Sequence, residues 1–271
     1  MTAALATATA SPSSTPRSRL GGATAELVFV GRSLRHSIRD GESLLMAIML
    51  PVIIMLMFTW VFGGAIFPGG GYVDYVVPGV ILICAGFGAS STAVYVANDM
   101  RTGIIDRFRT MPLRAGAVLT GHVVASVVRN LVATAIVIGV AVLVGFRPTA
   151  TFGEWIATAL LITFYLVALT YLFAAIGLAA GSPEGANGYG FILLFLPYLS
   201  SAFVPVQSMP EWLQPVATYQ PITPIVDSLR GLLSGTPVGD ELWWAMGWCA
   251  LILVIAVTWG AWLFRRKAGQ R

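Results

Sequence analysis

Residues 98–116, NDMRTGIIDRFRTMPLRAG, are the one strongly polar interruption within an otherwise apolar chain, and their charged residues could act on a partner. On a helix, the apolar residues of this stretch form one stripe, which consists of Met100, Ile104, Ile105, Phe108 and Met111. The charged side chains of Arg101, Asp106, Arg107 and Arg109 point to other faces, and Pro112 is expected to end the helix. A short amphipathic helix of this kind can lie on a membrane surface or insert its apolar face into a groove on a cytosolic partner.

Residues for catalysis or for cofactor binding are missing from the sequence. Its one lysine, Lys267, lies near the C-terminus, which excludes a GxxxxGK[ST] phosphate-binding loop and therefore an ATPase. The two histidines, His36 and His122, belong to no metal or haem motif. Cys84 and Cys249 fall within apolar runs and are predicted to be buried apolar residues. We expect no catalytic residue, no bound metal and no cofactor in this chain.

Composition identifies an integral membrane protein. Of 271 residues, 57% are hydrophobic and 10% are charged, and the mean hydropathy is +0.82, whereas a soluble domain has about 25% charged residues. Apolar runs of about 20 residues predict six spans, at residues 44–66, 75–97, 122–144, 154–180, 188–206 and 242–264. Runs this continuous lack the alternation of a barrel. The prediction is an all-α, polytopic membrane protein with six transmembrane helices.

The basic residues predict the orientation. Of the 16 Lys and Arg residues, 13 precede the first predicted span, follow the last, or lie in the loop 98–116. The positive-inside rule therefore places both termini and this loop in the cytoplasm, for a multi-pass protein of the inner (plasma) membrane. Because the basic residues flank spans and form no single patch, we expect the bilayer, not nucleic acid, to be their partner.

The remaining segments follow from local composition. Residues 1–24 are predicted to be a disordered cytosolic tail, residues 25–43 an interfacial elbow helix, residues 44–264 the membrane domain and residues 265–271 a basic cytosolic tail. Residues 205–235 contain five prolines among short apolar segments, which predicts re-entrant half-helices that enter the membrane from outside.

Two features of the predicted spans have more than one interpretation. GFGAS at residues 86–90 is faintly similar to a nucleotide or nucleophile motif, but it lacks both the GxGxxG and the GxSxG spacing, so helix packing is favoured. Arg129 lies about two turns inside a span, where it can snorkel to the cytosolic surface, bind a structural partner or contact substrate. Candidate residues for a substrate path are Phe58, Tyr95, Arg129 and Tyr198.

The absence of acidic residues well inside any predicted span counts against an ion-coupled carrier. Such carriers need titratable groups within the membrane to bind and release the coupling ion. The sequence therefore favours energy that is supplied by another polypeptide.

With its elbow, six spans, charged loop helix and proline-rich external segment, the chain resembles the permease subunit of ABC-2 type transporters. The resemblance is closest to daunorubicin-resistance-type drug-export permeases of actinobacteria. The motifs that carry it are NDMRTGIIDRFRTMP at residues 98–112 and SSAFVPVQSMPEWLQPVATYQPITPIVDSLRGLL at residues 200–233, and with the span pattern it covers nearly everything after residue 25. More distant members often have a glutamate-rich start to the loop helix, where this chain has Asn98 and Asp99.

The resemblance implies a homodimer bound to two copies of a cytosolic ABC ATP-binding subunit, which would hold the ATP and Mg. Closure of the ATPases would move the docked loop helices and change the packing of the first, second and fifth spans at the dimer interface. The implied coupling residues are Asp99, Met100, Arg101, Ile104, Asp106, Arg107, Phe108, Arg109 and Pro112.

The implied substrate is an amphipathic or hydrophobic compound, such as a drug, an antibiotic or a lipid-like molecule, that leaves toward the outside. Two alternatives remain at this point. One is an exporter of a cell-envelope glycolipid or polysaccharide, and the other is a membrane scaffold that transports nothing and recruits a cytosolic protein.

Overall fold

The computed structural model describes residues 41–102 and 115–268, and every regular element within these ranges is a helix. The all-α prediction is therefore confirmed. The long helices are α2 (Gly41–Leu56), α4 (Tyr72–Arg101), α6 (Ala115–Val144), α7 (Phe152–Ala179) and α11 (Glu241–Ala268). The shorter elements are a π-helix (Met57–Phe62), α3 (Gly63–Ile66), α8 (Pro183–Leu193), the 3₁₀ turns Leu196–Leu199 and Val206–Ser208, α9 (Gln214–Tyr219) and α10 (Ile222–Leu233).

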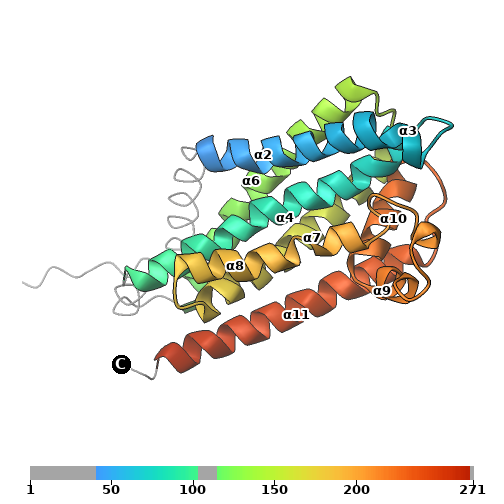
Figure 1. Ribbon diagram of the computed structural model, residues 1–271. Coiled ribbons are helices and arrows are strands. Elements are labelled where there is room, and N and C mark those ends of the chain that lie inside the picture. The colour runs from blue at the N-terminus through green and yellow to red at the C-terminus, as the bar shows by residue number, and fades with distance from the viewer. Residues whose placement is uncertain (1–40, 103–114, 269–271) are drawn as a thin grey trace, which may run out of the picture.

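Helix α4 is the centre of the bundle. It packs against α2, α6, α7, α8 and α10, while α11 packs against α7 and α10 (Figure 1). In its most apolar stretch, 72% of α4 is buried, against 28% for the first long helix and 17% for α11. Small residues allow this close packing, because a glycine lets two helix backbones approach.

Gly177 on α7 shows how little space separates the central helices. A Cβ atom added there would lie 2.4 Å from the carbonyl oxygen of Ala93 on α4, so the backbones would have to separate. We expect Gly177→Ala to destabilise the protein by about 1–3 kcal/mol, measured as a lower Tm in detergent. The matched control is Gly139→Ala on α6, where a Cβ meets nothing within 4 Å. Equal Tm values for the two variants would contradict this packing.

The bundle has two distinct ends. Helices α4 and α11 finish at the same end of the bundle, since Met100 and Phe264 both pack against a cluster that includes Leu178 of α7. This end carries Arg101, Arg265 and Arg266, and is called the basic end below. The opposite end, called the α10 end, contains α3, α9 and α10 (Figure 1). There Arg147 donates its backbone N–H to Asp74 at 3.0 Å, and Arg230 contacts Tyr75 at the start of α4.

The prediction of six transmembrane helices is not confirmed. Five described helices are long and apolar enough to cross a membrane: Ala47–Ile66, Tyr72–Arg101, Val123–Val144, Phe152–Ala179 and Glu241–Arg266. Residues 188–206 do not form one helix, because α8 ends at Leu193 and a separate 3₁₀ turn, Leu196–Leu199, follows with Pro197 near its start. Helix α8 begins earlier than predicted, since Ser182 caps it by accepting the N–H of Gly185 at 3.0 Å and Pro183 occupies the first turn.

The residues of this interrupted span, from α8 to Ala202, nevertheless follow α4 through the bundle. Three glycines mark this route, since a Cβ on Gly190 would lie 3.9 Å from Ser90, on Gly86 3.1 Å from Leu194, and on Gly79 2.6 Å from Ala202. The segment therefore runs antiparallel to α4 toward the α10 end. Gly86 lies at a helix contact, as the packing interpretation of GFGAS predicts. Cys84 and Cys249 are buried, also as predicted.

The predicted boundaries of the loop helix are wrong at both ends. Asn98 to Arg101 form the last turn of α4, which closes where Thr102 donates its N–H and its hydroxyl to the carbonyl of Asn98 at 2.9 and 3.0 Å. Ala115 already belongs to α6. The prediction ended the helix at Ala97, where polarity begins, but no glycine or proline lies between Ala97 and Gly103 to end it there.

Several predicted segments lie partly or wholly outside the described residues. These are the tail 1–24, residues 25–40 of the elbow, residues 103–114 of the loop and residues 269–271, whereas residues 41–43 begin α2 and residues 265–268 continue α11. In the region 205–235 two short helices are present, α9 and α10, and α10 packs against α4, α7 and α11. Their entry into a membrane remains a prediction.

Candidate functional site

The four candidate substrate-path residues form two separate pairs. Phe58 and Tyr198 lie on either side of Phe203, with ring centroids 4.3 and 5.1 Å from that of Phe203. In the other pair, the guanidinium carbon of Arg129 lies 5.7 Å from the ring centroid of Tyr95. The first pair belongs to a row of aromatic rings and the second to a polar cluster between α4 and α6.

The aromatic row connects α8 with the π-helix. Successive ring centroids are 4.3–6.1 Å apart along Phe191, Phe195, Tyr198, Phe203, Phe58 and Phe62. Its centre, Phe203, is 2% exposed, whereas its ends, Phe191 and Phe62, are 53% and 43% exposed. A row of this kind offers ring faces and edges to an apolar, planar molecule.

Breaks in two helices produce the aromatic row. The π-helix Met57–Phe62 separates Phe58 and Phe62 from the regular turns of α2, and the interruption at Pro197 turns Tyr198 toward Phe203. An apolar cavity of about 50 Å³ lies beside the break, lined by Phe87, Tyr165, Leu194, Leu196 and Pro197 among others. Since sites for drug-sized ligands have volumes of about 300–1,000 Å³, this cavity is too small to hold such a molecule.

Arg129 is buried between α4 and α6 and does not snorkel. It is 8% exposed, and its Nη2 donates to the carbonyl of Gly88 at 3.0 Å and to the hydroxyl of Ser91. Of the three interpretations of Arg129, the structure therefore shows the structural partners. Gly88 is needed for this contact, because a Cβ there would lie 1.5 Å from Oδ1 of Asn130.

Hydroxyl groups extend this contact between the two helices. Thr92 on α4 donates to Oγ of Ser126 at 2.9 Å, and Asn130 donates to the same oxygen at 3.3 Å. We call the whole group the Arg129 cluster, and its members are Gly88, Ser91, Thr92, Tyr95, Ser126, Arg129 and Asn130.

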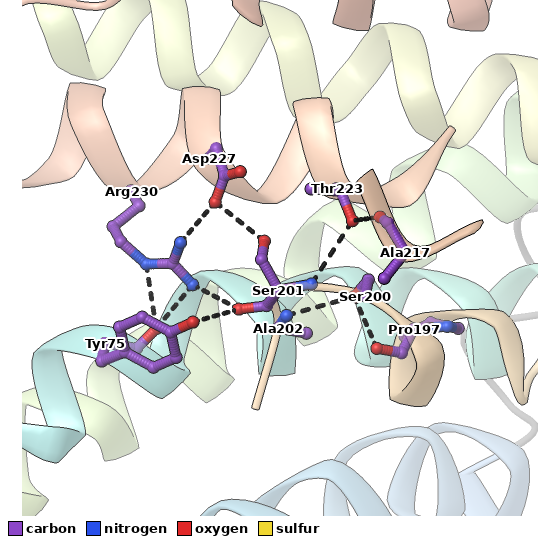
Figure 2. A network of polar contacts seen from close by, with 9 residues as sticks. All are labelled: Tyr75, Pro197, Ser200, Ser201, Ala202, Ala217, Thr223, Asp227 and Arg230. Carbon is purple, nitrogen blue, oxygen red and sulfur yellow. Dashed lines mark hydrogen bonds and ion pairs between the residues drawn. The ribbon is translucent and has the colours of Figure 1, made fainter. Parts of the chain in front are cut away.

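A second polar network lies at the α10 end and fixes the chain after the broken span (Figure 2). The carbonyl of Ser201 accepts bonds of 2.8 Å from both the Tyr75 hydroxyl and Arg230 Nη2. The Ser201 hydroxyl donates to Asp227 at 2.8 Å, and its N–H donates to Thr223 at 3.3 Å. Buried backbone outside a helix needs hydrogen-bond partners for its polar groups, and this network supplies them for Ser201, which is 5% exposed.

The charges of this network belong to α10. Arg230 forms an ion pair with Asp227 one turn away, and its guanidinium carbon lies 3.9 Å from the ring centroid of Tyr75. Burial raises the pKa of the Asp227 carboxyl, while the positive charge of Arg230 and the Ser201 hydrogen bond oppose this shift. No prediction from the sequence paired Asp227 with Arg230 or with Ser201. Only the three-residue spacing of Asp227 and Arg230 could have suggested their pairing.

Removal of Arg230 tests whether the network holds this segment in place. Arg230→Met leaves the Asp227 carboxylate without its cation, and we expect the protein to lose about 1–3 kcal/mol of stability. The side chains of Arg230 and Asp227 are 21% and 33% exposed, which keeps the loss below that of a fully buried pair. In Arg230→Met/Asp227→Asn the unpaired charge is gone, so part of the loss should be recovered in thermal unfolding. A double variant less stable than Arg230→Met would contradict this assignment.

Comparison with protein families gives the chain its identity. The family model described as ABC-2 type transporter matches residues 25–233, which is most of the chain and includes both polar clusters. The chain belongs to the ABC-2 type transporter family. It is a membrane permease subunit without a nucleotide-binding site, and the family implies a separate ATP-binding subunit as its partner.

Individual relatives of this permease carry more specific names. It is 31% identical over 191 residues to the daunorubicin resistance ABC transporter permease protein DrrB1 of Streptomyces coeruleorubidus, covering 70% of this chain and 68% of that protein. It is 25% identical over 239 residues, 84% of each chain, to the probable doxorubicin resistance ABC transporter permease protein DrrC of Mycobacterium tuberculosis. A putative transport permease, ycf38 of Pyropia yezoensis, is 25% identical over 236 residues, 82% of this chain and 75% of that protein.

The residues that this permease would use for coupling lie at or beyond the basic end. Arg101 is exposed on the last turn of α4, which also contains Asp99. Met100 packs against the cluster of Val96, Ala174 and Leu178, so its side chain contacts the bundle. The other predicted coupling residues lie outside the described residues: Ile104, Asp106, Arg107, Phe108, Arg109 and Pro112.

Proposed function

We propose that this permease exports amphipathic or hydrophobic drugs, as a homodimer with two copies of a cytosolic ATP-binding subunit. The observation that carries the proposal is the match of this chain to the ABC-2 type transporter family. The chain itself can contain no phosphate-binding loop, because its one lysine is Lys267. The energy for transport then comes from the partner, which holds ATP and Mg. The segment 98–116 is the proposed contact, because α4 and α6 both lead into it from the basic end.

The proposed orientation puts the basic end in the cytoplasm of a cell with the permease in its inner (plasma) membrane. Arg101, Arg265 and Arg266 would then face the inside, and Arg147 and Arg230 the outside, as the positive-inside rule requires. Five long helices plus the broken crossing beside α4 make six passes, which leaves both termini cytoplasmic. In this orientation α9 and α10 are the proposed re-entrant helices on the outer side.

The aromatic row is the proposed route for the substrate. Relatives of the permease are named for resistance to daunorubicin or doxorubicin, and a planar, amphipathic drug matches the stacked rings from Phe191 to Phe62. The exposed rings at the ends of the row would receive a molecule from the lipid. The buried ring of Phe203 would separate the inner part of the route from the outer part.

The proposed dimer uses surface that one chain leaves uncovered. Large apolar side chains of the first span are exposed, including Met49, Ile53 and Trp60. Helix α4 is already enclosed by its own chain. The first span is therefore better suited than α4 to contact a second copy.

Reconstitution tests the proposal. The permease is purified with its ATP-binding subunit and reconstituted in vesicles, and ATP hydrolysis and doxorubicin uptake are measured. Only complexes in the inside-out orientation, with the ATP-binding subunit on the outer surface of the vesicle, meet the added ATP. We expect hydrolysis to be stimulated by doxorubicin and uptake to require ATP. A permease that binds no ATP-binding subunit would refute the proposed assembly, and ATP hydrolysis without drug uptake over a panel of planar amphiphiles would refute the proposed substrate class.

A further inference from the structure

The Arg129 cluster joins the two helices that flank the proposed coupling segment. On α4, Gly88, Ser91 and Tyr95 are spaced three and four residues apart, and therefore lie along one face. On α6, Ser126 and Arg129 form the facing stripe, with direct bonds across the interface. Movement of the segment between Arg101 and Ala115 would act on both helices, and this cluster links them within the bundle.

Stability alone does not account for the cluster. A guanidinium inside a membrane bundle is costly, and apolar side chains would pack the same two helices without that cost. Two buried atoms, Nε of Arg129 and Oδ1 of Asn130, have no hydrogen-bond partner. Within the described ranges, no carboxylate forms an ion pair with Arg129. The charge is neither neutralised by an acid in that part of the chain nor fully hydrogen-bonded, which indicates a role beyond packing.

We propose that Arg129 is a positioning residue that ties α6 to α4, so that movement of the coupling segment displaces both helices as one unit. The inference rests on the proposed function, because it needs the ATP-binding subunit to act on residues 98–116. The acceptor of the Arg129 bond is the main-chain carbonyl of Gly88, 3.0 Å away. A bond to the main chain fixes the helix itself, whereas a bond between two flexible side chains does not.

The first experiment replaces Arg129 in the complete complex. Arg129→Met should retain the ATP-binding subunit and its ATP hydrolysis, but export at least ten-fold less doxorubicin per ATP. Arg129→Lys, which keeps a donor and a charge, should restore part of this ratio. Val132→Met, on the exposed face of the same helix, is the control and should match the wild type. An unchanged ratio in Arg129→Met, or no difference between the Met and Lys variants, would overturn the proposal.

A covalent tie provides an independent test if Arg129→Met folds poorly. The hydroxyl oxygens of Thr92 and Ser126 are 2.9 Å apart, so cysteines at these positions are close enough for one disulfide. We expect Thr92→Cys/Ser126→Cys to export doxorubicin equally well before and after oxidation. Oxidation of the same pair in the Arg129→Met variant should restore its export. Disulfide formation is followed by mass spectrometry.

Each result of the cross-linking separates two explanations. Loss of export on oxidation would show that α4 and α6 must slide past each other, which overturns the proposal. A cross-linked Arg129→Met variant that stays inactive would mean that Arg129 acts on the substrate itself, with the same consequence. Failure of the wild-type permease to bind its ATP-binding subunit would instead refute the proposed function, so the two failures are distinguishable.

Discussion

Replacing Ile104 and Phe108 together by aspartate is expected to abolish drug export and to release the ATP-binding subunit, while the permease remains in the membrane. Both residues belong to the apolar stripe of the coupling segment. A carboxylate forced into an apolar groove without a partner costs several kcal/mol, far more than about 1.4 kcal/mol, which corresponds to a tenfold change in affinity. Co-purification of the two subunits and export of doxorubicin should therefore both fall at least a hundredfold.

Thr110→Asp is the control for the aspartate substitutions. It adds the same charge two residues after Phe108, which is nearly the opposite face of a helix. It should leave both the assembly and the transport close to wild type. Normal export by the Ile104→Asp/Phe108→Asp variant would show that the stripe does not contact the ATP-binding subunit.

Phe203→Ala is expected to cause the largest loss of stability of any single change in the aromatic row. The ring is 2% exposed and packs between those of Phe58 and Tyr198, and truncation of a buried phenylalanine costs about 3–5 kcal/mol. Thermal unfolding in detergent should show this loss. Doxorubicin export should also fall at least tenfold, because the two halves of the row are no longer connected.

Two other variants separate the stability of the row from its role in transport. Phe203→Leu retains most of the buried volume but removes the ring, so we expect it to be closer to wild type in stability than Phe203→Ala, with export still impaired. Phe62→Ala alters an end of the row that is 43% exposed and should change stability by less than about 1 kcal/mol. Full export by Phe203→Leu would exclude the ring from the route.

Much of the fold could be predicted from the sequence because the membrane imposes simple requirements. Continuous apolar length identifies a helix that can cross the bilayer, and the described helices α2, α4, α6, α7 and α11 each overlap a predicted span. The fifth predicted span is broken near Pro197, which cannot donate a backbone hydrogen bond. Hydropathy did not reveal the break, because it measures the polarity of side chains and not backbone hydrogen bonding. Pro197 gave the only local warning.

The candidate site was less accessible to sequence reasoning because its contacts are long-range. Tyr75 and Ser201 are 126 residues apart, and Arg129 and Gly88 are 41 residues apart, so no local pattern indicates that they meet. Phe58 and Tyr198 were predicted for a substrate path, but Phe203, which connects them, was not. The first four residues of the predicted loop helix, 98–101, belong to the last turn of α4 instead, because a helix extends past the apolar region when nothing ends it. Residues 103–114 of the predicted helix lie outside the described residues.

The source of energy is the central question, and vesicle transport answers it most directly. Inside-out vesicles contain the permease with its ATP-binding subunit, and doxorubicin uptake is compared with ATP, with a non-hydrolysable analogue, and with a proton gradient in the absence of ATP. We expect uptake with ATP alone, and none when the phosphate-loop lysine of the ATP-binding subunit is replaced. Uptake driven by the proton gradient in vesicles that contain only this permease, in excess of the uptake by protein-free vesicles, would contradict the account.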